Sequence, residues 1–134
     1  MVERIYLTRE EIVIFKKILF SRLGKSAHGL LYVFGREIGK NMLKIDKINN
    51  IEDIKKMLKK RNLIEDIFFE GEDVIVIGSG EVGDLGFPNC DVLRGILSKM
   101  YEAMRGEELY CKEVECVGAG HKRCVFKIEN DILE

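Results

Sequence analysis

Residues 113–124 read Glu113-Val-Glu-Cys116-Val-Gly-Ala-Gly-His-Lys-Arg-Cys124. The apolar segments at residues 109–117 and 123–129 predict two strands, joined by a turn that contains two glycines. This turn places Cys116 directly opposite Cys124, and opposed residues have Cβ atoms about 4.5–5.5 Å apart on one face of the hairpin. Two thiolates at that separation can bind one metal ion, so the hairpin is a candidate metal site.

The spacing alone leaves the remaining ligands open. Glu113, Glu115 and His121 lie in the same stretch, and Cys90 precedes a predicted helix whose N-terminus favours a thiolate. Strand side chains alternate, so both glutamates should face away from Cys116 unless a β-bulge next to Glu115 turns one of them. Tetrahedral zinc needs about four N, S or O donors, and these residues are enough to supply them.

Two interpretations without a metal also fit the cysteines. Cys116 and Cys124 can pack as small buried apolar side chains, or they can form a disulfide. Cys111 is out of phase with Cys116 along the strand, which argues against four cysteines on one metal ion.

Length and composition predict one compact domain over residues 1–134, with 46% hydrophobic and 34% charged residues. The net charge of -1 and the mixed signs argue against nucleic acid and anionic membrane as partners. We expect a cytoplasmic protein, since the start lacks a signal-peptide pattern and no apolar run reaches ~18 residues. Glutamine is absent while Lys, Glu and Ile are abundant, a bias typical of proteins from hot environments.

Capping residues and apolar periodicity predict four helices. The capping box Thr8–Glu11 starts a helix that ends at Gly24, with Ile12, Phe15, Leu19 and Leu23 on its inner face. Ser26 and Asn50 are the predicted caps of the next two helices, and the four helices cover about residues 9–23, 27–43, 51–61 and 91–105.

The strands complete an α+β prediction. Residues 63–69 and 74–77 are β-branched and aromatic around a glycine turn, which indicates a hairpin, and residues 5–7 are a further short strand. We therefore expect N-terminal helices packed on a mostly antiparallel sheet, with one crossing helix and a C-terminal metal-binding hairpin.

A glycine-rich segment at residues 78–88 matches the G-x-G-x-x-G template of dinucleotide sites. Pro88 stands where the helix of such a site should already be running, and no second parallel βα unit follows. The segment is better interpreted as a flexible loop, a lid over a pocket.

The order Cys90, Glu113, Cys116 and Cys124 resembles the 4-vinyl reductase domain family, as do Leu30-Leu31-Tyr and the Gly35/Gly39 pair on the second helix. The resemblance spans about residues 19–128 and implies an α+β fold related to vesicle-tethering and haem-nitric-oxide domains. It also implies that these four residues bind zinc. Members of the family serve as sensor domains of bacterial regulators that bind small aromatic ligands.

The resulting prediction is a zinc-stabilised module that binds or senses a small hydrophobic or aromatic molecule without catalysis. A closed Cys₃Glu shell leaves no open position for water, so the metal should be structural. The alternatives are a reductase or accessory protein acting on a tetrapyrrole vinyl group, and an assembly scaffold. The rings expected to line the ligand pocket are Phe34, Phe69, Phe87 and Tyr101.

A homodimer is expected for two reasons. The second helix carries a stripe of small residues suited to close packing, at Ala27, Leu31, Gly35 and Gly39, and helix faces are left exposed. The sensor relatives also dimerise, which the resemblance extends to this chain.

Overall fold

The computed structural model describes residues 1–130, and within that range it contains four α-helices, one 3₁₀-helix and four strands. Their bounds are α1 (Arg9–Leu23), α2 (Ser26–Leu43), α3 (Ile51–Lys60), β1 (Asp66–Glu70), β2 (Asp73–Ile77), α4 (Asp91–Arg105), β3 (Tyr110–Glu115), the 3₁₀-helix Val117–Ala119 and β4 (Cys124–Glu129). The predicted α+β fold is confirmed. Among the described helices, none is long and apolar enough to cross a membrane.

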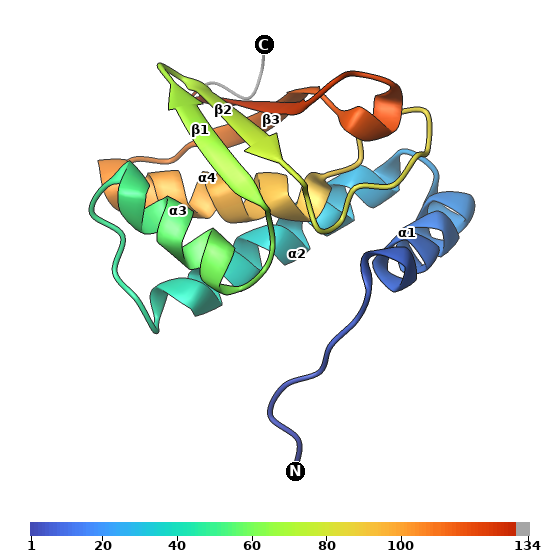
Figure 1. Cartoon of the computed structure of the whole chain (residues 1–134), viewed down its shortest axis with the longest axis horizontal. Coiled ribbons are helices and arrows are strands. Elements are labelled where there is room, and N and C mark those ends of the chain that lie inside the picture. The colour runs from blue at the N-terminus through green and yellow to red at the C-terminus, as the bar shows by residue number, and fades with distance from the viewer. Residues whose placement is uncertain (131–134) are drawn as a thin grey trace.

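The four strands form one antiparallel sheet in the order β1-β2-β4-β3. Both predicted hairpins are present, and β2 joins them by pairing with β4. Figure 1 shows α4 lying between the sheet and α2, with α3 and α1 at opposite ends of the molecule. The core fills the space between these layers, with Phe126, Leu97 and Met100 among its buried side chains.

Glycines set the close contact between α2 and α4. A Cβ atom added at Gly35 would lie 2.0 Å from the Val92 carbonyl oxygen, and one at Gly95 would lie 2.2 Å from the Tyr32 carbonyl oxygen. The two helix backbones therefore touch, which a side chain at either glycine would prevent. The small-residue stripe of α2 is used inside the chain and is not free to pair with a second copy.

Helix capping is partly as predicted. The Thr8–Glu11 capping box is formed in both directions, and Asn50 accepts a hydrogen bond from the Asp53 N–H at 3.0 Å. Ser26 does not cap α2: it is the first helical residue, and the N-cap Lys25 makes no side-chain cap bond. The corner between α1 and α2 is so short that backbone carbonyls of residues 24 and 25 already accept the first N–H groups.

Two expectations for the N-terminal region are wrong. Residues 5–7 form no strand; they are exposed and precede α1 as an extension without a pairing partner (Figure 1). The predicted inner face of α1 is also wrong in part. Phe15 and Leu23, expected on that face, are exposed, and Lys16 is the one fully buried side chain of the helix. A buried polar network at Lys16, described below, outweighs apolar burial in orienting this helix.

We expect Gly35→Ala to destabilise the protein by about 1–3 kcal/mol or more, because overpacking would force α2 away from α4. Gly29→Ala on the same helix is the matched control, since nothing lies within 4 Å of an added Cβ. That substitution should stabilise by roughly 0.5–1 kcal/mol through helix propensity. Urea unfolding measures both, and equal effects of the two substitutions would contradict the role assigned to Gly35.

Candidate metal centre

Four side chains from distant parts of the sequence meet at one end of the sheet. Cys90 is the N-cap residue of α4, Glu113 lies in β3, Cys116 follows β3 and Cys124 begins β4. Each offers one ligand atom, and these four atoms all lie within 4.8 Å of one another. The three cysteines are buried and Glu113 is half-buried. This cluster could hold a metal ion.

A β-bulge brings the carboxylate into the cluster. Glu113 pairs with Phe126, whereas Glu115 pairs with Val125, so the register shifts between the two glutamates. A bulge is therefore present next to Glu115, and it offsets the alternation that would otherwise turn Glu113 away from the thiols. The ladder ends there, because a 3₁₀-helix starts at Val117 and shortens the predicted strand.

The carboxylate of Glu113 is only half satisfied. Its Oε1 accepts a hydrogen bond from the Cys90 backbone N–H at 3.0 Å. Its Oε2 is buried and has no hydrogen-bond partner among the described residues. A buried polar atom without a partner is costly, and a metal ion bound at this oxygen would remove that cost.

The electrostatics of the cluster also fit a cation. Burial, and then the neighbouring Cys116, raise the pKa of Glu113 to about 9. Hydrogen bonding with Cys116 and then Cys124 raises the pKa of Cys90, while bonds with Cys116 and Cys90 lower the pKa of Cys124. Negative charge is thus favoured on Cys124 and disfavoured on Glu113 and Cys90. A divalent cation would favour the charged form of all the donors, since coordination deprotonates thiols.

The other candidate ligands lie outside the cluster. Glu115 points toward Arg123, with 4.0 Å between the carboxylate and guanidinium, and its side chain is partly exposed. His121 is exposed, and its Nδ1 accepts from the Cys116 backbone N–H at 3.1 Å. Cys111 is buried in β3 away from the cluster, and all four cysteines are free thiols rather than disulfide-bonded.

A buried ionic network fixes the segment that carries Cys90. The Lys16 ammonium donates to the carbonyl and side-chain oxygens of Asn89 and to the carbonyl and carboxylate oxygens of Glu81. The Glu81 carboxylate in turn accepts from the backbone N–H groups of Val92 and Leu93, in the first turn of α4. Cys90 is therefore held from both sides along the chain. Lys16 binds Asn89 directly before it, and Glu81 binds the backbone of Val92 and Leu93 just after it.

This network was not expected from the sequence. Lys16 lies four residues after Ile12 and four before Phe20, so a charged residue interrupts an apolar stripe of the helix. That position was a usable signal for a buried cation. Glu81 lies in the glycine-rich loop and Asn89 directly follows it, where the sequence gives no periodicity to show which side chains turn inward.

The loop itself packs against the turn of the metal centre. A Cβ atom at Gly118 would lie 2.0 Å from the Gly83 carbonyl oxygen, and the Gly86 N–H donates to the Gly118 carbonyl at 2.9 Å. The loop thus covers the 3₁₀-helix that follows Cys116. Its predicted function as a lid over a ligand stays a prediction.

The structure does not gather the four predicted ligand-binding rings around one described pocket. Phe34 is exposed on α2, and Phe87 packs edge-on against Phe20 with 4.9 Å between ring centroids. Phe69 and Tyr101 belong to the core, Tyr101 as a buried member and Phe69 as a partly buried neighbour. Burial raises the pKa of Tyr101 to about 12.

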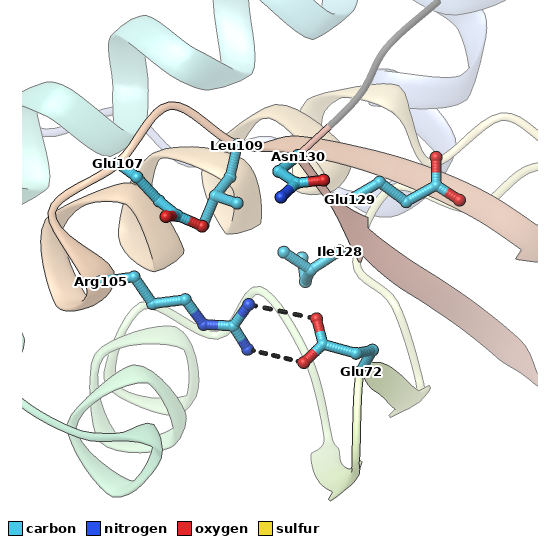
Figure 2. Close-up of a pocket in the computed structure, with 7 residues that line it drawn as sticks. All are labelled: Glu72, Arg105, Glu107, Leu109, Ile128, Glu129 and Asn130. Atoms are coloured by element: carbon cyan, nitrogen blue, oxygen red, sulfur yellow. Dashed lines mark hydrogen bonds and ion pairs between the residues drawn. The ribbon is translucent and has the colours of Figure 1, made fainter. Parts of the chain in front are cut away.

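Two described pockets lie near Asn130, and other residues line them. The first, of ≈ 400 Å³, is crossed by the ion pair between Arg105 and Glu72, as Figure 2 shows. The second, of ≈ 320 Å³, lies between α2, α4 and β3, and two tyrosines, Tyr32 and Tyr110, contribute to its wall. Neither is lined by the predicted rings, so their ligand contacts also stay a prediction.

Residues 80–130 match the family profile described as the V4R domain. The predicted resemblance to the 4-vinyl reductase domain family is confirmed. The V4R segment contains all four residues of the metal cluster, from Cys90 to Cys124. No curated protein matches the chain.

Several solved structures share the fold, among them the following two. One is a vinyl-4-reductase family protein from Methanocaldococcus jannaschii, with a TM-score of 0.69 and 24% identity, over 96% of this chain and 85% of the other. The second is the phenol-responsive sensory domain of the transcription activator PoxR, crystallised with phenol. It has a TM-score of 0.66 and 20% identity, over 95% of this chain and 76% of the other.

We expect Glu113→Ala to weaken metal binding by more than about tenfold, since even supporting residues of metal sites contribute 10–100-fold. Glu115→Ala should leave affinity unchanged, because its carboxylate points to Arg123. Cobalt(II) titration, followed by the visible absorption of thiolate-bound cobalt, measures both affinities. Equal losses in the two variants would reject the assignment of Glu113 as the carboxylate ligand.

Proposed function

We propose that this protein is a zinc-stabilised module that binds or senses a small hydrophobic or aromatic molecule and does not catalyse a reaction. In this proposal it acts in the cytoplasm as a homodimer, with Cys90, Glu113, Cys116 and Cys124 as the zinc ligands. The observation that carries the proposal is that the ligand atoms of these three thiols and one carboxylate all lie within 4.8 Å of one another.

The donor set favours zinc over other common ions. Thiolates are soft ligands that suit zinc, whereas magnesium and calcium prefer oxygen donors. Four protein donors would complete a tetrahedral shell, so the ion would lack the open position that Lewis-acid chemistry requires. Such an ion would join the start of α4 to the ends of β3 and β4, which is a structural contribution.

The ligand class rests on the shared fold and on pocket size. The phenol-responsive domain of PoxR has this fold, which supports a small aromatic ligand here. The two described pockets, of ≈ 400 and ≈ 320 Å³, lie at the low end of the ~300–1,000 Å³ typical of ligand sites. That size suits a single-ring molecule better than a tetrapyrrole.

We expect one zinc ion per chain in protein purified under reducing conditions. Cys124→Ser should lose the ion, and removal of zinc by a chelator should lower the melting temperature, because structural zinc contributes folding free energy directly. Cys111→Ala should retain the full zinc content, since Cys111 lies outside the cluster. Elemental analysis with thermal unfolding checks this, and metal-free wild-type protein of unchanged stability would refute it.

Phenol serves as the probe for ligand binding. At a concentration of 100 Kd, phenol should add about 2.7 kcal/mol to the free energy of unfolding of the purified protein. A higher melting temperature would show this gain. Tyr110→Phe removes a hydroxyl from the wall of the second pocket and should reduce this gain, whereas Tyr6→Phe, at an exposed tyrosine, should not. Absence of any gain, or equal gains in both variants, would count against binding of phenol in the second pocket. A coloured purified protein would favour the tetrapyrrole alternative.

A further inference from the structure

The motif Gly78-Ser-Gly-Glu-Val-Gly83 lies beside the candidate metal centre. Its second residue, Ser79, is 4% exposed, and the Ser79 Oγ lies 3.4 Å from the Sγ of the fully buried Cys90. Among the described residues, Ser79 is the one side chain outside the cluster that hydrogen-bonds a cluster thiol. The motif therefore contacts the metal centre through a hydroxyl group.

Glycines on both sides of Ser79 fix its position. Gly78 has a φ of +66°, which favours glycine, and its carbonyl accepts a hydrogen bond from the Glu65 N–H at 3.1 Å. The Gly80 N–H donates to the Leu63 carbonyl at 2.8 Å. The backbone is thus attached, before and after Ser79, to the segment between α3 and β1, and these attachments hold the hydroxyl beside Cys90.

Metal binding would fix the direction of the hydrogen bond between Ser79 and Cys90. A thiol can donate or accept, but a thiolate has no hydrogen and can only accept. The Ser79 oxygen itself accepts from the Glu81 N–H at 3.4 Å, and its hydroxyl hydrogen remains free for the sulfur. With an ion bound, Ser79 would therefore donate to the Cys90 thiolate.

A donor at this position would offset excess negative charge. Three thiolates and a carboxylate carry more negative charge than a divalent ion neutralises, and the cluster is largely buried. Two of the ligands already accept from backbone donors: the Val117 N–H lies 3.5 Å from the Cys124 Sγ, and the Cys90 N–H lies 3.0 Å from the Glu113 Oε1. Such hydrogen bonds orient metal ligands and tune the ion. Ser79 would do the same for the Cys90 sulfur.

We infer that Ser79 is a positioning residue of the metal centre, whose hydroxyl donates to the Cys90 thiolate and holds it in place for the ion. The inference rests on the proposed metal site and adds a residue beyond its four ligands. It also gives the glycine motif a function, because the motif presents a hydroxyl to sulfur instead of backbone N–H groups to a phosphate. Glu81 and Gly83 of the same motif bind the residues on either side of Cys90.

Ser79→Ala tests the inference, with Ser98→Ala as the matched control. Ser98 is fully buried on α4, and its hydroxyl donates to the Gly95 carbonyl at 2.8 Å. Both substitutions therefore remove one hydroxyl and its hydrogen bond from the interior, but Ser98 contacts no cluster thiol. Cobalt(II) is the probe, because its thiolate charge-transfer absorption reports on the sulfur ligands directly.

Ser79→Ala should weaken cobalt(II) binding by about tenfold, the lower end of the range for supporting residues of metal sites. The charge-transfer absorption should also move to longer wavelength, because a sulfur that loses a hydrogen bond holds its electrons less tightly. A merely structural contribution of the hydroxyl would leave this wavelength unchanged. Ser98→Ala should keep the affinity and the spectrum of the wild type.

An unchanged wavelength or an unchanged affinity in Ser79→Ala would overturn the inference, as would equal changes in the two variants. Each of these results leaves the metal proposal intact, since the wild type would still bind cobalt(II). A wild type without thiolate–cobalt absorption would instead reject the metal site and the inference together. Failure of the metal proposal and failure of the assignment of Ser79 therefore give different results.

Discussion

The backbone contact between α2 and α4 is the constraint on which the rest of the structure depends. Gly35 and Gly95 allow the two helices to touch, so α4 can lie between α2 and the sheet without a gap. The start of α4 carries Cys90, and its middle fills the core with Leu97 and Met100. A wider helix spacing would displace both at once, since cores are close-packed and transmit small shifts.

A second constraint is the crowding of four ionisable side chains in the candidate metal centre. Packing three thiols and a carboxylate into a buried space is unfavourable for charge, and the structure responds by favouring charge on Cys124 and neutral Glu113. The same crowding would make the site responsive to a cation, because the ion would compensate charge that the protein alone cannot. Coordination would also supply the partner that the buried Glu113 Oε2 lacks among the described residues.

Local signals in the sequence were sufficient for the two hairpins and for the Cys116/Cys124 pair, whereas Cys90 and Glu113 were assigned through the family resemblance. Glycine turns and β-branched runs located both hairpins, and the spacing of Cys116 and Cys124 required only that the second hairpin close in register. Alternation alone showed only that a glutamate would need a β-bulge to reach the thiols, and the bulge lies between Glu113 and Glu115. These features depend on neighbours along the chain, where periodicity is informative.

Features that depend on distant partners could not be predicted in the same way. The reversal of α1 follows from the bonds of Lys16 to Glu81 and Asn89, which are more than sixty residues away. The aromatic pocket was assigned from elements expected to converge, yet Phe34 is exposed while Tyr101 is buried in the core. A stripe of glycines on a helix allows close packing either with a second copy of the chain or with another helix of the same chain. Only the structure shows that the glycines of α2 pack against α4 of the same chain.

The strand order has a consequence for how the protein is made. β4 is the last of the four described strands along the chain, yet it lies between β2 and β3, and its first residue is Cys124. The ribosome therefore releases all four helices and three strands before the sheet can close. Until then β2 keeps an unpaired edge and the cluster lacks one thiol, so the nascent chain depends on its early helical contacts to avoid association with other chains.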